Sequence, residues 1–242
     1  MICSISRVRA GWITLCGLLQ LLFAAEARPG ALPVQLTVPS AASGSIGGNG
    51  GRSAAVVLVH GINDSARSMS RIKRFLESRG RRAYAISLKP NNASVSFDVM
   101  ARQLDTFVTA TLPAGEKFDL VAFSMGGLVA RYYIQKLGGY GRVRRFVTLS
   151  TPNHGTFWAW LSGRRGVKEM RPGSEMLRDL NGNAGKLVSL DYTSIYTPFD
   201  LSILPATSSR MPEARNVIAW VPLHPLMVMM PGPLHAVARA LE

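Results

Sequence analysis

The sequence is nearly without cysteine, which excludes two common ways of stabilising a small domain. Only Cys3 and Cys16 are present among 242 residues, and both stand close to the N-terminus. From residue 17 onward the chain therefore has no means of forming a disulfide or a thiolate metal site. We expect no metal site and assign no metal-binding residue.

Acidic residues are also scarce. The chain has 14 Asp and Glu against 28 Lys and Arg, which gives a formal net charge of +14. Such a balance suits nucleic acid, an anionic membrane surface or an acidic polymer. Aromatic residues do not interleave with the basic clusters, so we expect no specific nucleic acid partner. Solvated arginines explain the charge most simply, and an anionic membrane or lipid surface is the alternative.

Charged residues make up only 17% of the chain, whereas hydrophobic residues make up 47%. Intrinsically disordered chains show the opposite balance, so the sequence predicts a folded protein. A length of 242 residues is enough for one domain with a sizeable core. We expect residues 53–242 to form that single domain and the protein to be a monomer.

Residues 1–27 contain, in sequence, the basic, apolar and small-residue segments of a secretory signal peptide. Arg7 and Arg9 precede an apolar run over residues 11–25, which ends in a small-x-small cleavage site. The run is about 15 residues long, short of the roughly 20 that a membrane-spanning helix needs. An uncleaved anchor is the alternative. Residues 28–52, rich in Pro, Ser and Gly, predict a flexible leader, and the protein is expected to be secreted or periplasmic.

Segments typical of strands and of helices alternate along the rest of the chain. This pattern predicts an α/β protein with a mostly parallel sheet and helices on both of its faces. Ligands of such proteins bind beyond the carboxyl ends of the strands. The expected strands are 54–59, 83–88, 120–123, 143–149, 193–196 and 215–220, and the expected helices are about 66–78, 96–110, 128–137 and 234–241.

A sharp turn from strand to helix is expected at Ser124. An apolar run over 120–123 precedes this serine, and an apolar helical face follows it. Ala122, Gly126 and Gly127 lack bulk where the chain must turn. A serine held this way is a nucleophile elbow, with its hydroxyl exposed above the sheet. Ala122 replaces the glycine of the commoner motif and is small enough for the same packing.

A serine nucleophile needs a base, and the base needs a carboxylate that orients it. In enzymes with a nucleophile elbow the chain order is serine, acid, histidine. Among the acids between Ser124 and His224, only Asp200 follows directly on an expected strand end. His224 lies just after the last expected strand. We therefore assign Asp200 as the acid and His224 as the base, with His235 as second choice for the base.

The oxyanion of such a reaction needs two backbone donors. One is the N–H of Met125, the residue after the nucleophile, and the other is the N–H of Ile62, in the loop after the first strand. For the apolar cluster at 157–161 the alternatives are an acyl pocket, a small mobile flap and ordinary core. The candidates for the substrate pocket are His60, Gly61, Phe123, Asn153, Phe157 and Trp158.

Together these motifs resemble the bacterial secreted lipases of the α/β-hydrolase superfamily, particularly the small lipases of Bacillus type. The resemblance implies an α/β-hydrolase fold with a minimal lid domain or none, hydrolysis of carboxylic esters, and no cofactor. The spacing before His224 also resembles that family, and it selects His224 over His235. The similarity covers about residues 54–230 and rests on Val59-His60-Gly61-Ile62, the elbow, Tyr192-Thr193-Ser194-Ile195-Tyr196 with Asp200, and Ala214-Arg215-Asn216-Val217 with His224.

Two departures from that family's pattern concern the surroundings of the site. Phe123 stands where the family usually has a histidine, and Pro222-Leu223-His224-Pro225 replaces a small, polar surround of the catalytic histidine. Both bear on the range of substrates more than on the type of reaction.

We therefore expect a serine hydrolase that cleaves carboxylic esters and takes a lipid or ester substrate. Triacylglycerol lipase is the first choice, because the site loops are apolar and export is expected. An esterase for short or polymeric esters and an amidase or acyltransferase with the same triad are alternatives. A non-catalytic binding protein on this fold is disfavoured, because Ser124, Asp200 and His224 stand in the required order.

Overall fold

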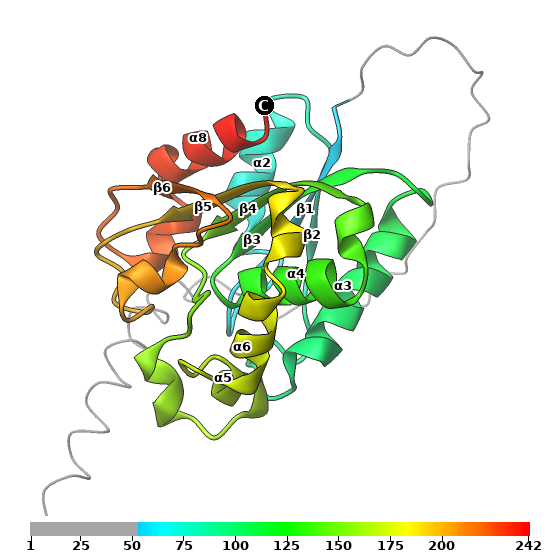
Figure 1. Cartoon of the computed structure of the whole chain (residues 1–242). Helices are drawn as coiled ribbons and strands as arrows, with labels where there is room; N and C mark the ends of the chain where they lie inside the picture. Colours follow the sequence, from blue (N-terminus) through cyan, green and yellow to red (C-terminus); the bar gives the residue numbers. More distant parts are fainter. Residues whose placement is uncertain (1–52) are drawn as a thin grey trace, which may run out of the picture. The chain divides into compact units, whose positions relative to one another are not determined.

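Six parallel strands form the centre of the protein in the computed structural model, which describes residues 53–242 (Figure 1). Their order is β2-β1-β3-β4-β5-β6, and every neighbouring pair is parallel. The expected α/β fold with a parallel sheet is confirmed. The signal peptide and leader expected within residues 1–52 lie outside the described residues. The strands are β1 (Ala55–Val59), β2 (Ala83–Ile86), β3 (Phe118–Phe123), β4 (Val143–Leu149), β5 (Asp191–Tyr196) and β6 (Arg215–Ile218).

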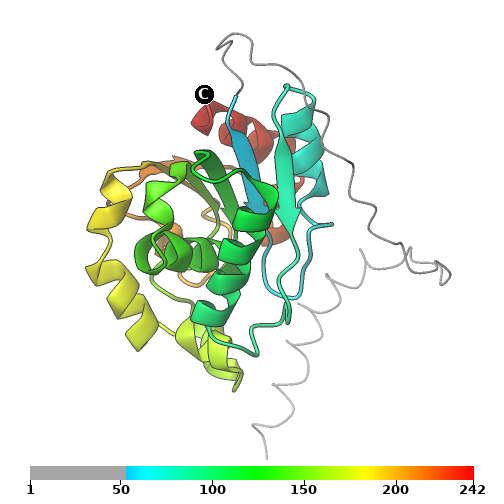
Figure 2. The ribbon, with the colours of Figure 1, turned by 90° about the vertical axis from the view of Figure 1, so that its right-hand side faces the viewer.

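The central strands are apolar on both faces because helices cover both sides of the sheet. In β1, Val57 and Val59 join one core cluster, whereas Val56 and Leu58 join the other. Successive side chains of a strand point to opposite faces, so one apolar run feeds two cores. In Figure 2, α2 (Ser70–Glu77) and α8 (Pro231–Ala240) lie on the other side of the strands from α3 (Phe97–Thr111) and α4 (Met125–Lys136).

Some boundaries differ from those expected. The helix expected over 66–78 begins only at Ser70, because residues 65–70 form successive turns instead. Strand β6 ends at Ile218, two residues early.

Within the described residues, no helix has both the length and the apolar character needed to cross a membrane. The remaining elements are η1 (Gly139–Gly141), η2 (Phe157–Leu161), α5 (Arg165–Glu169), α6 (Glu175–Gly182), α7 (Gly185–Val188), η3 (Ala206–Ser209) and η4 (His224–Val228).

The strand register brings the candidate site residues together at one end of the sheet. Val59 pairs with Ala122, Ala122 with Thr148, and Leu149 with Ile195. Four strands therefore end almost level with one another, and the residues that follow them become neighbours in space. These residues are His60 after β1, Ser124 after β3, Ser150 after β4 and Thr197 after β5.

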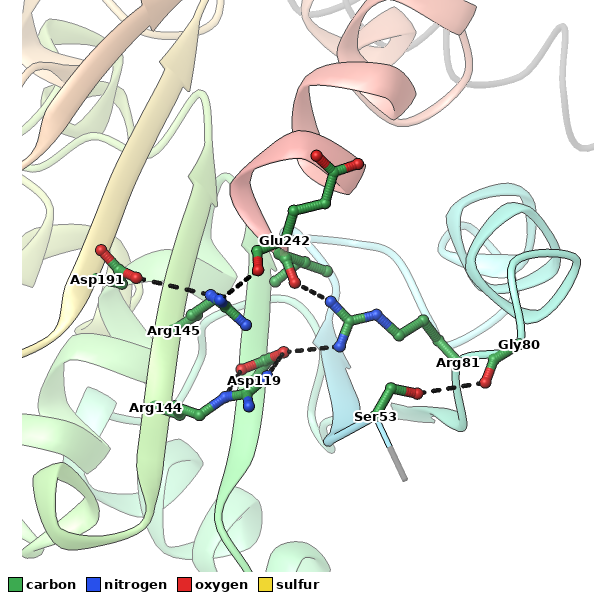
Figure 3. A network of polar contacts seen from close by, with 9 residues as sticks. Ser53, Gly80, Arg81, Asp119, Arg144, Arg145, Asp191 and Glu242 are labelled. Atoms are coloured by element: carbon green, nitrogen blue, oxygen red, sulfur yellow. Dashed lines mark hydrogen bonds and ion pairs between the residues drawn. The ribbon is translucent and has the colours of Figure 1, made fainter. Parts of the chain in front are cut away.

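At the opposite end of the sheet, an ion-pair network holds the start of β3 (Figure 3). The Asp119 carboxylate is fully buried and accepts hydrogen bonds from Arg81 at 3.2 Å and from Arg144 at 3.0 Å. Arg81 also donates to the carbonyl of Leu241, and Arg145 donates to the carbonyl of Glu242 at 2.6 Å. The network ties the end of the chain, just beyond α8, to the sheet.

We predict that Asp119→Ala lowers the free energy of unfolding by about 3 kcal/mol, because it leaves two arginines without their buried partner. The matched control is Asp191→Ala. Asp191 contacts Arg145 at 3.6 Å, but its side chain is 79% exposed, so the expected change is within about 0.5 kcal/mol. Urea unfolding of both variants measures the difference, and equal losses would contradict a structural role for the Asp119 network.

Candidate active site

Ser124 occupies a strained turn between β3 and α4. Its backbone has φ 54° and ψ −126°, a conformation that residues other than glycine rarely adopt. The Ser124 N–H donates to the Leu149 carbonyl of β4 at 2.8 Å, and the Gly127 N–H donates to the Ser124 carbonyl at 3.0 Å. These bonds anchor the turn from both sides. This is the strand, turn and helix geometry expected of a nucleophile elbow.

Gly126 and Gly127 must be glycines, because no side chain fits at either position. A Cβ atom at Gly126 would lie 2.4 Å from the His60 carbonyl oxygen, and one at Gly127 would lie 1.9 Å from the Thr151 Oγ1. Helix α4 therefore begins in contact with the loops that follow β1 and β4. Ala122, at the position of the usual glycine, is fully buried in the core without displacing the elbow.

His224 and Asp200 are brought together although 24 residues separate them. The His224 Nδ1 and the Asp200 Oδ2 lie 2.7 Å apart, and both residues are buried. The other oxygen of Asp200 accepts the N–H groups of Ser202 and Ile203, each at 2.9 Å. Both oxygens of the carboxylate therefore have hydrogen-bond partners, and the carboxylate orients the His224 ring through its Nδ1 atom. This leaves the Nε2 atom of His224 free to act on a substrate.

The ring of His224 also packs against the residue that precedes the serine. The ring centroids of Phe123 and His224 are 4.7 Å apart. The Bacillus-type lipases that this sequence resembles usually have a histidine at this position. Phe123 instead gives His224 an apolar support. The second choice for the base, His235, lies on α8, where its ring stands nearly perpendicular to that of Phe75 and its Nδ1 contacts the Pro231 carbonyl.

The environment of Asp200 favours its ionised form. Burial raises the pKa of the carboxyl, but the hydrogen bond and the charge of His224, together with the Ile203 N–H, outweigh that effect. The pKa of Asp200 therefore lies below its ordinary value. An ionised Asp200 can stabilise a protonated His224, as acyl transfer requires.

The two residues expected to supply oxyanion donors are Met125 and Ile62. Met125 is the first residue of α4, so its N–H is among those that have no acceptor within the helix. Ile62 follows Gly61, whose backbone approaches the serine so closely that a Cβ there would lie 3.2 Å from the Ser124 Cβ. The two backbone segments therefore flank the serine side chain from β1 and from α4.

His60 organises the loop that carries Ile62. It is fully buried, and its Nε2 accepts the N–H of Leu88 at 2.9 Å, so the proton of the neutral ring is on Nδ1. That Nδ1 donates to the Gly61 carbonyl at 2.7 Å. Burial lowers the pKa of His60, which keeps the ring neutral. His60, a candidate for the pocket lining, is therefore a buried residue, and its hydrogen bond fixes the peptide plane that carries the Ile62 N–H.

Asn153, another pocket candidate, is likewise fully buried. Its Nδ2 donates to the Ser209 carbonyl at 2.9 Å, and its Oδ1 accepts from Arg131 at 3.3 Å. Arg131 also donates to Gln135 at 3.1 Å and to Asn181 at 2.8 Å. This arginine was not identified from the sequence. It braces the loop after β4 from within, and burial lowers the pKa of its guanidinium.

The two aromatic candidates lie at the surface. Phe157 is 60% exposed and Trp158 is 40% exposed, both in η2. The Trp158 Nε1 donates to the carbonyl of Leu201, the residue after the catalytic acid candidate, at 2.6 Å. Of the three alternatives for this cluster, ordinary core is therefore wrong for these two side chains.

A second carboxyl group near the site is Asp64, in the loop after β1. Burial raises its pKa, and a hydrogen bond from Ser68 lowers it in part. The charge that His224 carries when protonated also acts on Asp64. Sequence reasoning gave Asp64 no role.

In the described part of the chain, no group of three or more His, Cys, Asp or Glu is arranged to hold a metal ion.

Comparison with known proteins identifies relatives of this chain. A model of the palmitoyl protein thioesterase family matches residues 55–197, more than half of the chain. Palmitoyl-protein thioesterase 3 of Dictyostelium discoideum is 28% identical over 107 residues, which cover 42% of this chain. The match spans only 37% of the length of that relative.

Solved structures share the fold at low sequence identity. The mature lipase BlEst2 of Bacillus licheniformis is 18% identical, with a TM-score of 0.64 over 79% of this chain and 93% of that chain. Lipase B of Aspergillus fumigatus is 16% identical, with a TM-score of 0.56 over 71% of this chain and 42% of that chain. The expected α/β-hydrolase fold and the resemblance to bacterial lipases are confirmed.

We predict that Gly126→Ala lowers the free energy of unfolding by about 2 kcal/mol or more, because the new methyl group meets a backbone carbonyl that has no room to move. The control is Gly182→Ala in α6, where an added Cβ meets nothing within 4 Å. That change should leave stability equal or raise it by up to about 1 kcal/mol. Thermal unfolding of both variants checks this, and a stable Gly126→Ala protein would contradict the packing of the elbow.

We predict that Asp64→Asn stabilises the protein at neutral pH. The pKa of Asp64 is higher in the folded than in the unfolded chain, so the fold loses stability as pH rises through the folded pKa. Asparagine keeps an acceptor but does not ionise. Its advantage over wild type should grow as the pH rises and vanish below about pH 3.9. Urea unfolding across this range measures it, with the exposed Asp105→Asn as control. A pH-independent difference would be the contrary result.

Proposed function

The chain belongs to the palmitoyl protein thioesterase family, and on this premise we propose that it is a serine hydrolase that releases fatty acids from thioesters and oxygen esters. The observation that carries the proposal is the 2.7 Å hydrogen bond between Asp200 and His224, formed beside the strained turn that holds Ser124. Ser124 and the Asp200–His224 pair both lie at the carboxyl end of one sheet, and an acyl-transfer site needs a nucleophile and an oriented base there.

The proposed reaction proceeds through an acyl-enzyme. Ser124 Oγ attacks the carbonyl carbon of the substrate while His224 Nε2 takes the hydroxyl proton. The carbonyl oxygen becomes an oxyanion held by the N–H groups of Ile62 and Met125. When the tetrahedral intermediate collapses, the bond to sulfur or oxygen breaks, and His224 returns its proton to the departing thiol or alcohol.

Water then completes the cycle. His224 takes a proton from a water molecule, whose oxygen attacks the acyl carbon of the acyl-enzyme. The second tetrahedral intermediate collapses with cleavage of the bond to Ser124 Oγ, which regains its proton from His224. The fatty acid leaves, and the site returns to its starting state. No redox step occurs, so the reaction needs no electron carrier.

The surroundings favour a substrate with a long acyl chain. Phe123 is 4% exposed beside His224, and it gives the site an apolar floor in place of a polar side chain. The exposed rings of Phe157 and Trp158 lie in η2, which contacts the loop that carries Asp200. These apolar side chains suit a hydrocarbon chain, whose removal from water contributes binding energy in proportion to the area buried.

Triacylglycerol hydrolysis, the first choice from the sequence, becomes one substrate class among several. The name of the matching family describes palmitoyl thioesters on proteins, whereas the structural neighbours named lipases share only the fold. The same site geometry serves oxygen esters and thioesters, because both react at an acyl carbonyl. Export, which residues 1–27 indicate, stays a prediction.

We predict that the full chain hydrolyses a palmitoyl thioester, and that Ser124→Ala and His224→Ala each lower kcat by about 10⁴-fold or more. Parallel assays use p-nitrophenyl palmitate and an emulsified triacylglycerol, which separate thioesterase from lipase activity. His235→Ala is the matched control, since that histidine lies on α8 and should leave turnover unchanged. Turnover that survives Ser124→Ala would refute the assignment of the nucleophile.

A further inference from the structure

We propose that a cluster of exposed apolar side chains around the Asp200 loop binds the surface of an anionic lipid bilayer. The inference rests on the proposed function, because it says where the enzyme meets a substrate whose acyl chain lies in a membrane. We call this surface the aromatic collar. It consists of Phe157, Trp158, Trp160, Leu161, Leu201 and Trp220.

The exposure of these side chains is unusual for a surface facing only water. Trp160 is 57% exposed, Leu161 61%, Leu201 67% and Trp220 70%. Single exposed apolar residues are common, but a contiguous group marks a surface that contacts another apolar phase. All three tryptophans of residues 53–242 belong to the collar.

The members of the collar are joined by contacts, although they come from three segments of the chain. The Trp158 Nε1 donates to the Leu201 carbonyl at 2.6 Å, so η2 lies against the Asp200 loop. Phe199, on the other side of Asp200, has its ring 5.9 Å from that of Trp220, just beyond β6. The collar therefore runs from η2 past the catalytic acid to the end of the sheet.

The collar is held in shape by the protein and does not need a partner to form. Arg171 donates to the carbonyls of Ala159 at 3.2 Å and Ser162 at 3.1 Å, one within η2 and one directly after it. Its guanidinium also lies 4.6 Å from the ring centroid of Trp160. This arginine fixes the middle and the end of the exposed stretch, which lowers the conformational entropy lost on binding.

The charges next to the collar select an anionic surface. Exposed Arg164, Arg165 and Lys168 follow η2 directly in the chain. The acid among them, Glu169, accepts the Phe97 N–H at 2.8 Å and lies 3.8 Å from Arg165, so its charge is engaged. Basic side chains beside tryptophan and leucine are the combination with which proteins bind anionic lipid interfaces.

A bilayer fits this position better than a second protein does. Ser124 and His224 are 6% and 9% exposed, and the collar lies around the loop of their partner Asp200. A protein seated there would cover the approach to the site. A lipid surface instead brings the acyl chain of the substrate to the site, and tryptophan indoles prefer the boundary between headgroups and hydrocarbon.

The test uses full-length Ser124→Ala protein, in which turnover cannot alter the vesicles. Sedimentation with phosphatidylcholine vesicles, with and without phosphatidylglycerol, measures the partition coefficient. We expect binding that requires phosphatidylglycerol and weakens at high salt. Adding Trp160→Ser and Leu161→Ser should lower the partition coefficient about tenfold or more, since both side chains would leave the hydrocarbon boundary. The matched control adds Tyr140→Ser and Val188→Ser, 51% and 67% exposed next to the starts of β4 and β5, and should bind like the parent.

A second measurement reports contact directly. In a Trp12→Phe background the remaining tryptophans are those of the collar, and brominated lipids should quench their fluorescence. Absence of vesicle binding, equal binding by both double variants, or a lack of quenching would overturn the proposal. Dimers that form without vesicles and dissociate in the Trp160→Ser, Leu161→Ser variant would assign the collar to a second copy instead. Turnover of a soluble acetyl thioester by proteins with Ser124 intact tests the proposed function separately from binding.

Discussion

The contact between the start of α4 and the loop after β1 is the constraint on which the site depends. Gly126 lies so close to the His60 carbonyl that no side chain fits between them. This approach forces the chain to reverse within one residue, and Ser124 takes the unfavourable backbone conformation, at a cost of about 1–3 kcal/mol. Burial of β3 and α4 in the core offsets that cost, so the strained serine is a product of the packing around it.

The same approach explains why His60 is buried and neutral. Its carbonyl meets α4 while its ring joins β1 to the segment after β2 through Leu88. His60 thereby sets the distance between the elbow and the loop after β1, which carries Ile62. On the opposite side of the site, backbone N–H groups hold Asp200, and Asp200 holds His224. Main-chain contacts position Ser124, the proposed nucleophile, and the side chains of Asp200 and Phe123 position His224, the proposed base. These contacts keep the geometry stiff where acyl transfer needs it.

Local patterns were sufficient to predict the sheet, the elbow and the residues that form the Asp200–His224 pair. Apolar runs and small residues act over a few positions, so Ser124 and β3 could be identified without tertiary contacts. The places of His60 and Asn153 could not, because their partners, Leu88 and Ser209, lie far away in sequence. For Arg131 one signal existed: it stands four residues before Gln135 on an otherwise apolar helix face. Spacing alone gives no hint that Asn181 and Asn153 complete its hydrogen bonds.

The two ends of the sheet therefore differ in what they contribute. At the amino end, Asp119 and its arginines tie the chain terminus to the strands with charges that face one another. At the carboxyl end, the backbone strain at Ser124 and the exposed aromatic rings both reduce stability. Natural proteins accept such local costs where function requires them and compensate elsewhere in the fold. The strained backbone of Ser124 and the exposed rings beside the loop that carries Asp200 are together an argument that this end of the sheet is the functional one.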